Sequence, residues 1–194
     1  LELQGKDEAR FTLSASSAGK AEREGETTLW LRDGNQTLLA SATFSVVRQQ
    51  EQWQLVIGGL QGPRRNVPHE VIKLATRACY GLFPKRLLIE FIWALAARSH
   101  IQAIYGVSDN GHVFRALRYR LSKGRHFHAS YDEFWQSIDG VADGAWRWRL
   151  PRQMERKSLD AIASKKRAEY RRRFQLLDDL IAQVAQVAQL TPQP

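Results

Sequence analysis

The fold is decided by the stretch Trp53-Gln54-Leu55-Val56-Ile57, which runs directly into Gly58-Gly59-Leu60-Gln61-Gly62-Pro63-Arg64-Arg65. Two helical patterns follow, and a second apolar run, Ala103-Ile104-Tyr105-Gly106-Val107, ends in Ser108-Asp109-Asn110-Gly111. A strand, a glycine-rich turn, helices and a second strand predict a right-handed crossover in which the two strands are parallel neighbours. Ligands of such units bind beyond the carboxyl ends of the strands. The sequence therefore predicts a site at residues 58–65 and 108–111, without naming its chemistry.

The residues before this stretch alternate between apolar and polar, which is typical of strands. We expect a short strand over Phe11–Ala15 and longer strands over Thr27–Arg32 and Thr37–Val47. The last two are joined at Asp33-Gly34-Asn35, which predicts a hairpin because Gly and Asn tolerate positive φ. In the Thr37–Val47 strand, the face that carries Ser41, Thr43 and Ser45 is expected to be wet or lightly covered. The first part of the chain is therefore predicted to be an antiparallel meander.

Two helices are predicted between the parallel strands, beginning near Pro68 and at Pro84, because proline fits the first turn of a helix. After residue 111 we expect a short basic helix through Arg115–Leu121 and a strand over Arg125–His128. The predicted architecture is an α+β domain over residues 1–151, with a basic amphipathic helical segment over residues 152–190 packed on it.

Further along, Tyr131–Trp135 is predicted to be a helical turn capped by Asp132. The strand before Pro151 is expected to place Trp146 and Trp148 on its core face. From Ser158 onward the apolar spacing is that of a helix packing on a partner face.

Composition bounds the class of protein. With 194 residues, 43% of them hydrophobic, the chain can bury one full core. It begins at Leu1 without a methionine, and we expect it to be a piece of a longer chain. No uncharged run approaches the ~20 residues that cross a bilayer, so no transmembrane segment is expected. Cys79 is the single cysteine, which excludes disulfides and cysteine–zinc clusters within the chain, and no metal site is predicted.

The net charge of +9 is concentrated in one segment. Between Arg152 and Arg173 the chain has nine Lys and Arg residues against three acidic ones. A local basic face suggests an anionic partner, namely an acidic protein or an anionic membrane, with nucleic acid disfavoured; a solvated helix face is the alternative. The candidate partner-binding residues are Lys165, Lys166, Arg167, Arg171, Arg172 and Arg173.

Two basic, glycine-containing segments could hold the phosphates of a ligand. Glycines let the backbone approach closely, and the N–H groups at a helix start favour anionic oxygens. The first segment follows the Trp53 strand and the second opens the Pro84 helix. The candidate cofactor-binding residues are Gly58, Gly59, Gln61, Gly62, Arg64 and Arg65 in the first, and Gly81, Lys85 and Arg86 in the second.

Three residues are candidates for proton transfer. Asp109 and His112 lie at the predicted edge of the crossover, and His69 lies beside Pro68. Any of them could act as a general base if it is held near that edge. The Gly-x-Ser-x-Gly, Walker and GxGxxG patterns are absent, which disfavours common hydrolases, kinases and dinucleotide enzymes.

Six stretches taken together resemble the VirK/YbjX family of Gram-negative bacteria, which is defined by a domain of unknown function. They are Ile57-Gly58-Gly59-Leu60-Gln61-Gly62, Gly81-Leu82-Phe83-Pro84-Lys85-Arg86-Leu87, Gly106-Val107-Ser108-Asp109, Tyr131-Asp132-Glu133-Phe134-Trp135, Asp143-Gly144 and Ser164-Lys165-Lys166-Arg167-Ala168-Glu169-Tyr170-Arg171-Arg172-Arg173. The resemblance implies a longer amino end and a cytoplasmic protein, and the basic residues before the amphipathic helix allow a peripheral position at the inner membrane. It also implies effects on envelope properties, virulence and resistance to cationic antimicrobial peptides. It implies no reaction and no catalytic residues.

The element order is also similar to that of the GNAT-type acyltransferases: an antiparallel meander, a phosphate-binding turn, a helix and a parallel strand. That resemblance implies acyl-CoA or an acyl-carrier protein between the parted strands. Gln61-Gly62-Pro63-Arg64 departs from the usual turn of that fold, and an extra helix intervenes.

Two functions therefore stay open. The chain is either an acyltransferase that uses an acyl-thioester carrier, or a non-catalytic scaffold or regulator that binds acidic protein, anionic lipid or nucleic acid through its basic helix.

Overall fold

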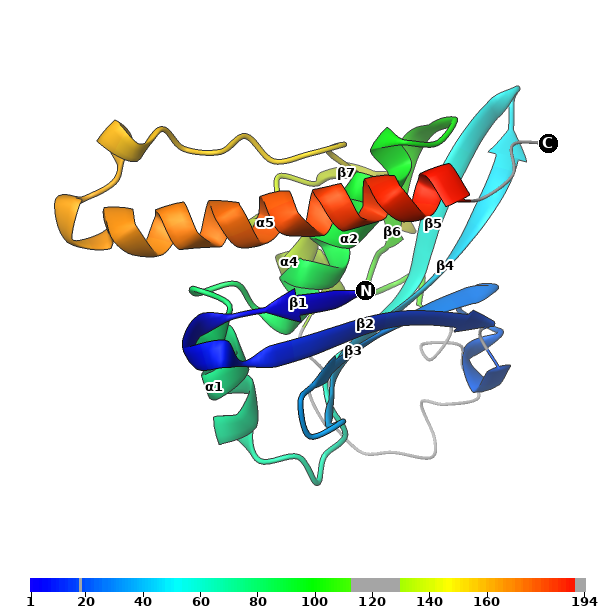
Figure 1. Cartoon of the computed structure of the whole chain (residues 1–194). Helices are drawn as coiled ribbons and strands as arrows, with labels where there is room; N and C mark the ends of the chain where they lie inside the picture. The colour runs from blue at the N-terminus through cyan, green and yellow to red at the C-terminus, as the bar shows by residue number, and fades with distance from the viewer. Residues whose placement is uncertain (18, 113–129, 191–194) are drawn as a thin grey trace.

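The structure, a computed structural model, describes residues 1–17, 19–112 and 130–190. The strands of this part form one sheet of eight in the order β1-β2-β3-β4-β5-β6-β8-β7 (Figure 1). Only β5 and β6 pair in parallel within that sheet. The strands are β1 (Glu2–Gln4), β2 (Arg10–Ser17), β3 (Thr27–Asp33), β4 (Leu38–Gln49), β5 (Gln52–Gln61), β6 (Ile101–Val107), β7 (Val141–Asp143) and β8 (Arg147–Leu150).

The helices connect and cover this sheet. Both α1 and α2 lie in the connection between the parallel strands β5 and β6, and α5 packs on α2 and reaches β1 (Figure 1). The helices are α1 (His69–Ala78), α2 (Pro84–Ala97), α4 (Tyr131–Ser137) and α5 (Ser164–Leu190), with single 3-10 turns at Lys6–Glu8, Gly19–Ala21 and Leu159–Ala161. The predicted α+β class, with a meander that leads into a strand–helix–strand crossover, is confirmed, as is the helical carboxy-terminal segment.

The core lies between the sheet and the helices. Leu55 and Ile57 of β5 are fully buried, as are Leu88 and Ile92 of α2, and α5 adds Leu180. Burying an aliphatic side chain of this size stabilises a fold by about 1.5–3 kcal/mol. The crossover thus packs its own apolar helix, α2, on the sheet. This packing holds the two parallel strands in place.

The second face of the sheet differs from the expectation. Ser41 and Thr43, predicted to be wet or lightly covered, are buried, and the Thr43 hydroxyl shares a hydrogen bond of 2.9 Å with that of Thr28. Pairing two hydroxyls offsets the cost of removing both from water. Only Ser45 is half-buried, so this face is covered over much of its length.

Two local predictions were wrong in detail. In the β3–β4 turn the positive φ falls on Gln36 (63°), and the Asp33 carboxylate accepts hydrogen bonds from the N–H groups of Asn35 and Thr37. Trp146 precedes β8 in a turn and is 66% exposed, whereas Trp148 packs on the core. The helix expected through Arg115–Leu121 and the strand over 125–128 lie outside the described residues.

Candidate functional site

The parallel strands part at the edge where the sequence places the site. Their pairing ends at Ile57 and Gly106, because a bulge in the β4–β5 ladder leaves Gly58 without a partner between Ile57 and Gly59. Beyond that point β5 stays with β4, while Val107 pairs with Arg147 of β8. A bulge bends its strand and re-aims the residues after it. The predicted gap between the strand ends is therefore present.

The gap is filled by aromatic side chains from α4. The Tyr131 hydroxyl oxygen accepts hydrogen bonds from Leu60 N (3.1 Å) and Gln61 Nε2 (3.0 Å). Trp135 is fully buried and donates from Nε1 to the Val107 carbonyl (2.8 Å). The two rings are stacked with centroids 6.2 Å apart. The expected glycine-lined opening is thus occupied by rings that satisfy the polar groups of both strand ends.

Gly58 and Gly59, candidate cofactor residues, make room for a part of the chain itself. A Cβ on Gly58 would lie 1.9 Å from the carbonyl oxygen of Glu24, and one on Gly59 would lie 1.7 Å from Glu24 Oε2. Both contacts are far too short, so the segment between β2 and β3 can approach β5 only over glycine. The space expected for a ligand backbone is taken by Glu24.

Glu24 faces His112, one of the candidate bases. His112 Nε2 lies 3.4 Å from Glu24 Oε1, and each side chain is 7% exposed. The Tyr131 ring is stacked on the His112 ring with centroids 5.0 Å apart and an interplanar angle of 25°. We call Glu24, His112 and Tyr131 the Glu24 cluster. A carboxylate beside an imidazole orients the ring, which suits a general base.

Tyr131 is held as a neutral phenol. Burial raises its pKa, the hydrogen bond from Leu60 N opposes that rise, and the negative charges of Glu24 and Asp109 add to it. Because the phenol oxygen accepts two hydrogen bonds, its own proton is left to be donated.

Asp109, the second candidate base, holds the start of α4. Its carboxylate accepts hydrogen bonds from Tyr131 N (2.9 Å) and from the hydroxyl of Ser130, which is the N-cap of α4. Asp132, predicted to be the cap, instead accepts from Asp109 N (3.0 Å) and from Trp148 Nε1 (2.8 Å). Two carboxylates therefore fix α4 to the end of β6, and Asp109 acts on the cluster by placing Tyr131.

The other candidate residues are not in the Glu24 cluster. His69 is exposed at the first residue of α1, and Arg64 and Arg65 are exposed after β5. Arg86 pairs with Glu90 of its own helix (2.6 Å). At Gly81 a Cβ would lie 2.5 Å from an Arg173 guanidinium nitrogen, so α5 covers that glycine.

The two predicted phosphate segments do meet at one point. A Cβ on Gly62 would lie 3.8 Å from Lys85 Cε, so the end of β5 touches the start of α2. Burial lowers the pKa of the Lys85 amine. This is the place where the predicted cofactor residues come together.

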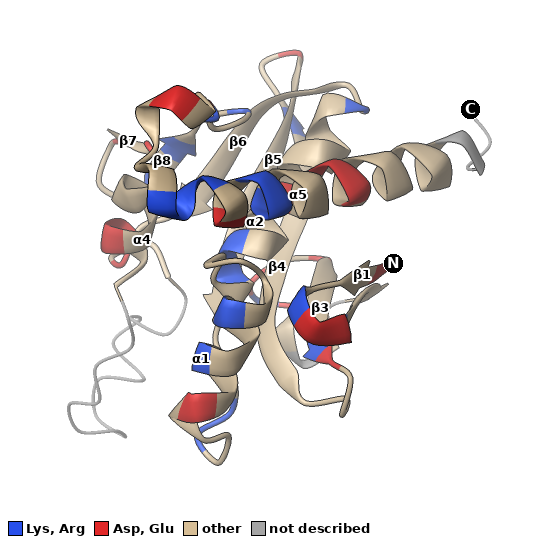
Figure 2. Cartoon of the chain, turned by 60° about the vertical axis from the view of Figure 1, so that its left-hand side comes forward, with Lys and Arg blue, Asp and Glu red and all other residues tan. Residues whose placement is uncertain are grey.

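The basic residues of α5 divide into two groups. Lys165, Lys166, Arg171 and Arg172 are exposed, and Figure 2 shows basic ribbon concentrated on this half of α5. Arg173 Nε donates to the Tyr80 carbonyl (2.8 Å), and Arg167 Nε donates to the Ile162 carbonyl (3.0 Å). The second group therefore stabilises the fold, and the four exposed residues are those that a partner could reach.

Sequence reasoning did not find Glu24 or the role of Tyr131. Glu24 lies in a polar loop far from β5 in the chain, and no local spacing relates it to His112. The stretch Tyr131–Trp135 was recognised as helical, but nothing local shows that its rings enter the gap between strands.

Family comparison identifies the chain. A model described as "Protein of unknown function (DUF535)" matches residues 1–186. The chain belongs to the DUF535 family. The DUF535 relatives include the uncharacterized protein YbjX of Escherichia coli, 43% identical over 183 residues, and an uncharacterized protein of Haemophilus influenzae, 31% identical over 164 residues. These matches confirm the resemblance to the VirK/YbjX family.

The chain spans about half the length of the curated DUF535 relatives that it matches. The match to YbjX covers 94% of this chain and 55% of YbjX. The match to the Haemophilus protein covers 84% of this chain and 53% of that protein. A cAMP-binding acyltransferase mutant from Mycobacterium smegmatis aligns with a TM-score of 0.42 and 8% identity, over 94% of this chain and 56% of that one. A likeness of this extent supports no inference about function.

None of the described helices has the length and apolar character that crossing a bilayer requires. Within the same residues, no group of three or more His, Cys, Asp and Glu side chains is arranged to hold a metal ion.

Proposed function

We propose that this chain carries the catalytic centre of an acyltransferase, in which His112, oriented by Glu24, is the general base. The observation that supports this most is the buried contact of 3.4 Å between His112 Nε2 and Glu24 Oε1, beside the ends of the parted parallel strands. A carboxylate that faces an imidazole in a site with little water is the arrangement that activates an amine or a hydroxyl.

The proposed reaction moves an acyl group from a thioester to an amine or hydroxyl. As the acceptor atom bonds to the thioester carbon, the His112 imidazole, with Glu24 beside it, takes the proton of that atom. The carbon–sulfur bond then breaks, and the departing thiolate takes the proton that His112 accepted, so that it leaves as a thiol and the imidazole is restored.

The carrier would approach from the Gly62 end of β5. Lys85 lies against Gly62, and Arg64 and Arg65 are exposed beside it, so positive charge lines that approach. Such a surface suits the phosphates of acyl-CoA or the phosphopantetheine of an acyl-carrier protein. Because Tyr131 occupies the gap between the strands, we place the thioester beside the Tyr131 hydroxyl and outside the gap.

The acceptor would lie at the bacterial envelope. The four exposed basic residues of α5 can bring the protein to an anionic membrane surface, where each is worth about 1 kcal/mol. Acylation of an envelope component there would account for the effects on antimicrobial-peptide resistance and virulence that the family resemblance implies.

Calorimetry on the full-length protein tests the carrier. Acetyl-CoA, longer acyl-CoAs and acyl-carrier protein are titrated, and we expect at least one to bind, more weakly after Lys85→Ala. His69→Gln is the matched control, because His69 is exposed on α1 and outside the cluster. Absence of heat with every carrier would falsify the proposal.

The alternative is a non-catalytic scaffold or regulator that docks through α5. The exposed Lys165, Lys166, Arg171 and Arg172 favour it, since the structure gives them no role in packing. Reversing these four charges should abolish its function, while Glu24→Gln and His112→Gln should leave it intact. The opposite pattern favours the enzyme.

A further inference from the structure

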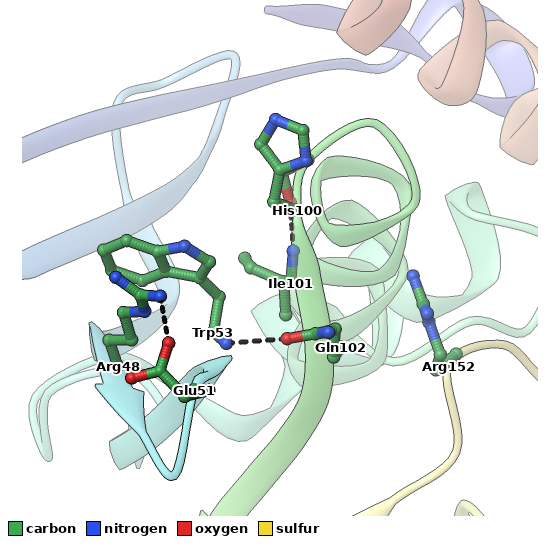
Figure 3. Close-up of a pocket in the computed structure, with 8 residues that line it drawn as sticks. Arg48, Glu51, Trp53, His100, Ile101, Gln102 and Arg152 are labelled. Atoms are coloured by element: carbon green, nitrogen blue, oxygen red, sulfur yellow. Dashed lines mark hydrogen bonds and ion pairs between the residues drawn. The ribbon is translucent and has the colours of Figure 1, made fainter.

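A second hollow lies at the other end of the parallel strands. It is lined by residues of the β4–β5 turn, the α2–β6 turn and the segment after β8, and its volume is about 480 Å³ (Figure 3). We call it the Arg152 hollow. The lining residues are Arg48, Glu51, Trp53, Ser99, His100, Ile101, Gln102 and Arg152. Because it lies at the amino ends of β5 and β6, it is separate from the Glu24 cluster at their carboxyl ends.

Hydrogen-bond donors meet in this hollow. Gln102 Oε1 accepts from Trp53 N (2.8 Å), which fixes the side-chain amide, and Arg152 lines the same hollow (Figure 3). Within the described residues, neither Arg152 nor His100 makes a hydrogen bond or ion pair through its side chain. Arg152 and the Gln102 amide, both exposed to solvent, therefore line one hollow with donors that bond to no acceptor among the described residues.

The charge of the hollow is positive. Its one carboxylate, Glu51, is already paired with Arg48. Among the lining residues, Arg152 is left as an uncompensated cation. A planar guanidinium beside an amide is suited to several oxygens of one anion.

An aromatic surface borders the donors. Trp53 is 41% exposed, and the Arg48 guanidinium lies 5.9 Å from the centroid of its ring. A large aromatic side chain that stays exposed next to solvent-accessible donors is typical of a small-molecule site with one apolar and one polar end. The volume is within the ~300–1,000 Å³ range of such sites.

We propose that the Arg152 hollow binds a phosphorylated small molecule that carries a flat ring. The phosphate is held by the Arg152 guanidinium and the Gln102 amide, with His100 at its edge, and the ring lies against Trp53. A tetrahedral phosphate can accept from three donors that come from different segments, which a carboxylate does less well. The site requires neither the Glu24 cluster nor acyl transfer.

Titrations monitored by calorimetry and tryptophan fluorescence test this on the full-length protein. Phenyl phosphate is compared with inorganic phosphate and with benzyl alcohol. We expect phenyl phosphate to bind most tightly, inorganic phosphate more weakly, and benzyl alcohol not measurably. Equal affinity for the two phosphates would overturn the role of Trp53, and no binding of either would overturn the site.

Arg152→Ala should weaken phenyl phosphate about 10-fold or more, the loss typical of a hydrogen-bonded charged partner. Arg149→Ala is the matched control, since it removes the same charge from an exposed position on the neighbouring β8 and outside the hollow. Equal weakening by both variants would show general charge attraction and overturn the proposal. Arg152→Lys should recover only part of the affinity, because a lysine cannot make the bidentate contact.

Discussion

Tyr131→Phe tests whether the gap between the parallel strands depends on one hydroxyl. That oxygen accepts from Leu60 N (3.1 Å) and Gln61 Nε2 (3.0 Å), and the substitution removes it while it keeps the ring. Leu60 is 2% exposed, so its N–H would lose its partner inside the protein. Gln61 is half-buried and can turn toward water.

The expected loss of stability follows from these contacts. An unsatisfied buried N–H costs about 1–3 kcal/mol, whereas the Gln61 bond is replaced by water at little net cost. We therefore expect the free energy of unfolding to fall by about 2 kcal/mol. For a chain of this size that corresponds to a fall in Tm of roughly 4–8 °C.

Urea unfolding and thermal melts of the wild type and the variant measure this loss. Tyr170→Phe is the matched control, because Tyr170 is also half-buried and its hydroxyl makes no hydrogen bond within the described residues. It should change the free energy of unfolding by less than about 0.5 kcal/mol. If both variants were equally stable, the hydroxyl would not hold the strand end and this reasoning would be refuted.

Three further predictions concern stability. Burial raises the pKa of Cys79 from 9.0 to about 12, so the folded chain keeps this proton when the unfolded chain loses it. The stability that the protonated Cys79 thiol contributes is complete below pH 9 and is lost between pH 9 and 12, by at most about 1.4 kcal/mol per pH unit. The urea midpoint of Cys79→Ala should therefore fall less steeply with rising pH than that of the wild type. Gly106→Ala would place a Cβ 2.4 Å from the Trp135 ring and should cost about 1–3 kcal/mol, with a change in tryptophan fluorescence; unaltered emission and stability would contradict the packing. Arg173→Ala should lower the free energy of unfolding, measured in urea, by about 1–2 kcal/mol, because it loses the hydrogen bond to the α1–α2 turn. Arg172→Ala, at an exposed position, should leave that free energy nearly unchanged.

Local sequence patterns were sufficient to predict the order of the main strands and helices. Each of these patterns can be recognised from a few neighbouring residues: the alternation before Gly58, the helices that begin at proline, and the short apolar run at Ile104. Together they predict a pair of parallel strands. The α5 helix was predicted on the same basis. In the β3–β4 turn the hairpin was right and the residue with positive φ was not, because Asp33 closes the turn with its side chain.

The site depends on contacts that are distant in the chain. The sequence predicts that Gly58 and Gly59 make room for a ligand. The absence of side chains also lets Glu24 approach, and only the folded chain shows which of the two occupies the space. Asp109 was read as a base, but α4, which begins more than twenty residues later in the sequence, supplies the donors that occupy it. His112 is the predicted base that the structure places beside a carboxylate, that of Glu24.

The most direct test of the account is the rate of thiol release from an acyl thioester by the full-length protein in a single turnover with an amine or hydroxyl acceptor. We predict release by the wild type, a fall of about 10²–10⁴-fold in His112→Gln, and an unchanged rate in His69→Gln, with all three proteins folded. Equal rates in the wild type and His112→Gln would contradict a catalytic role for the Glu24 cluster.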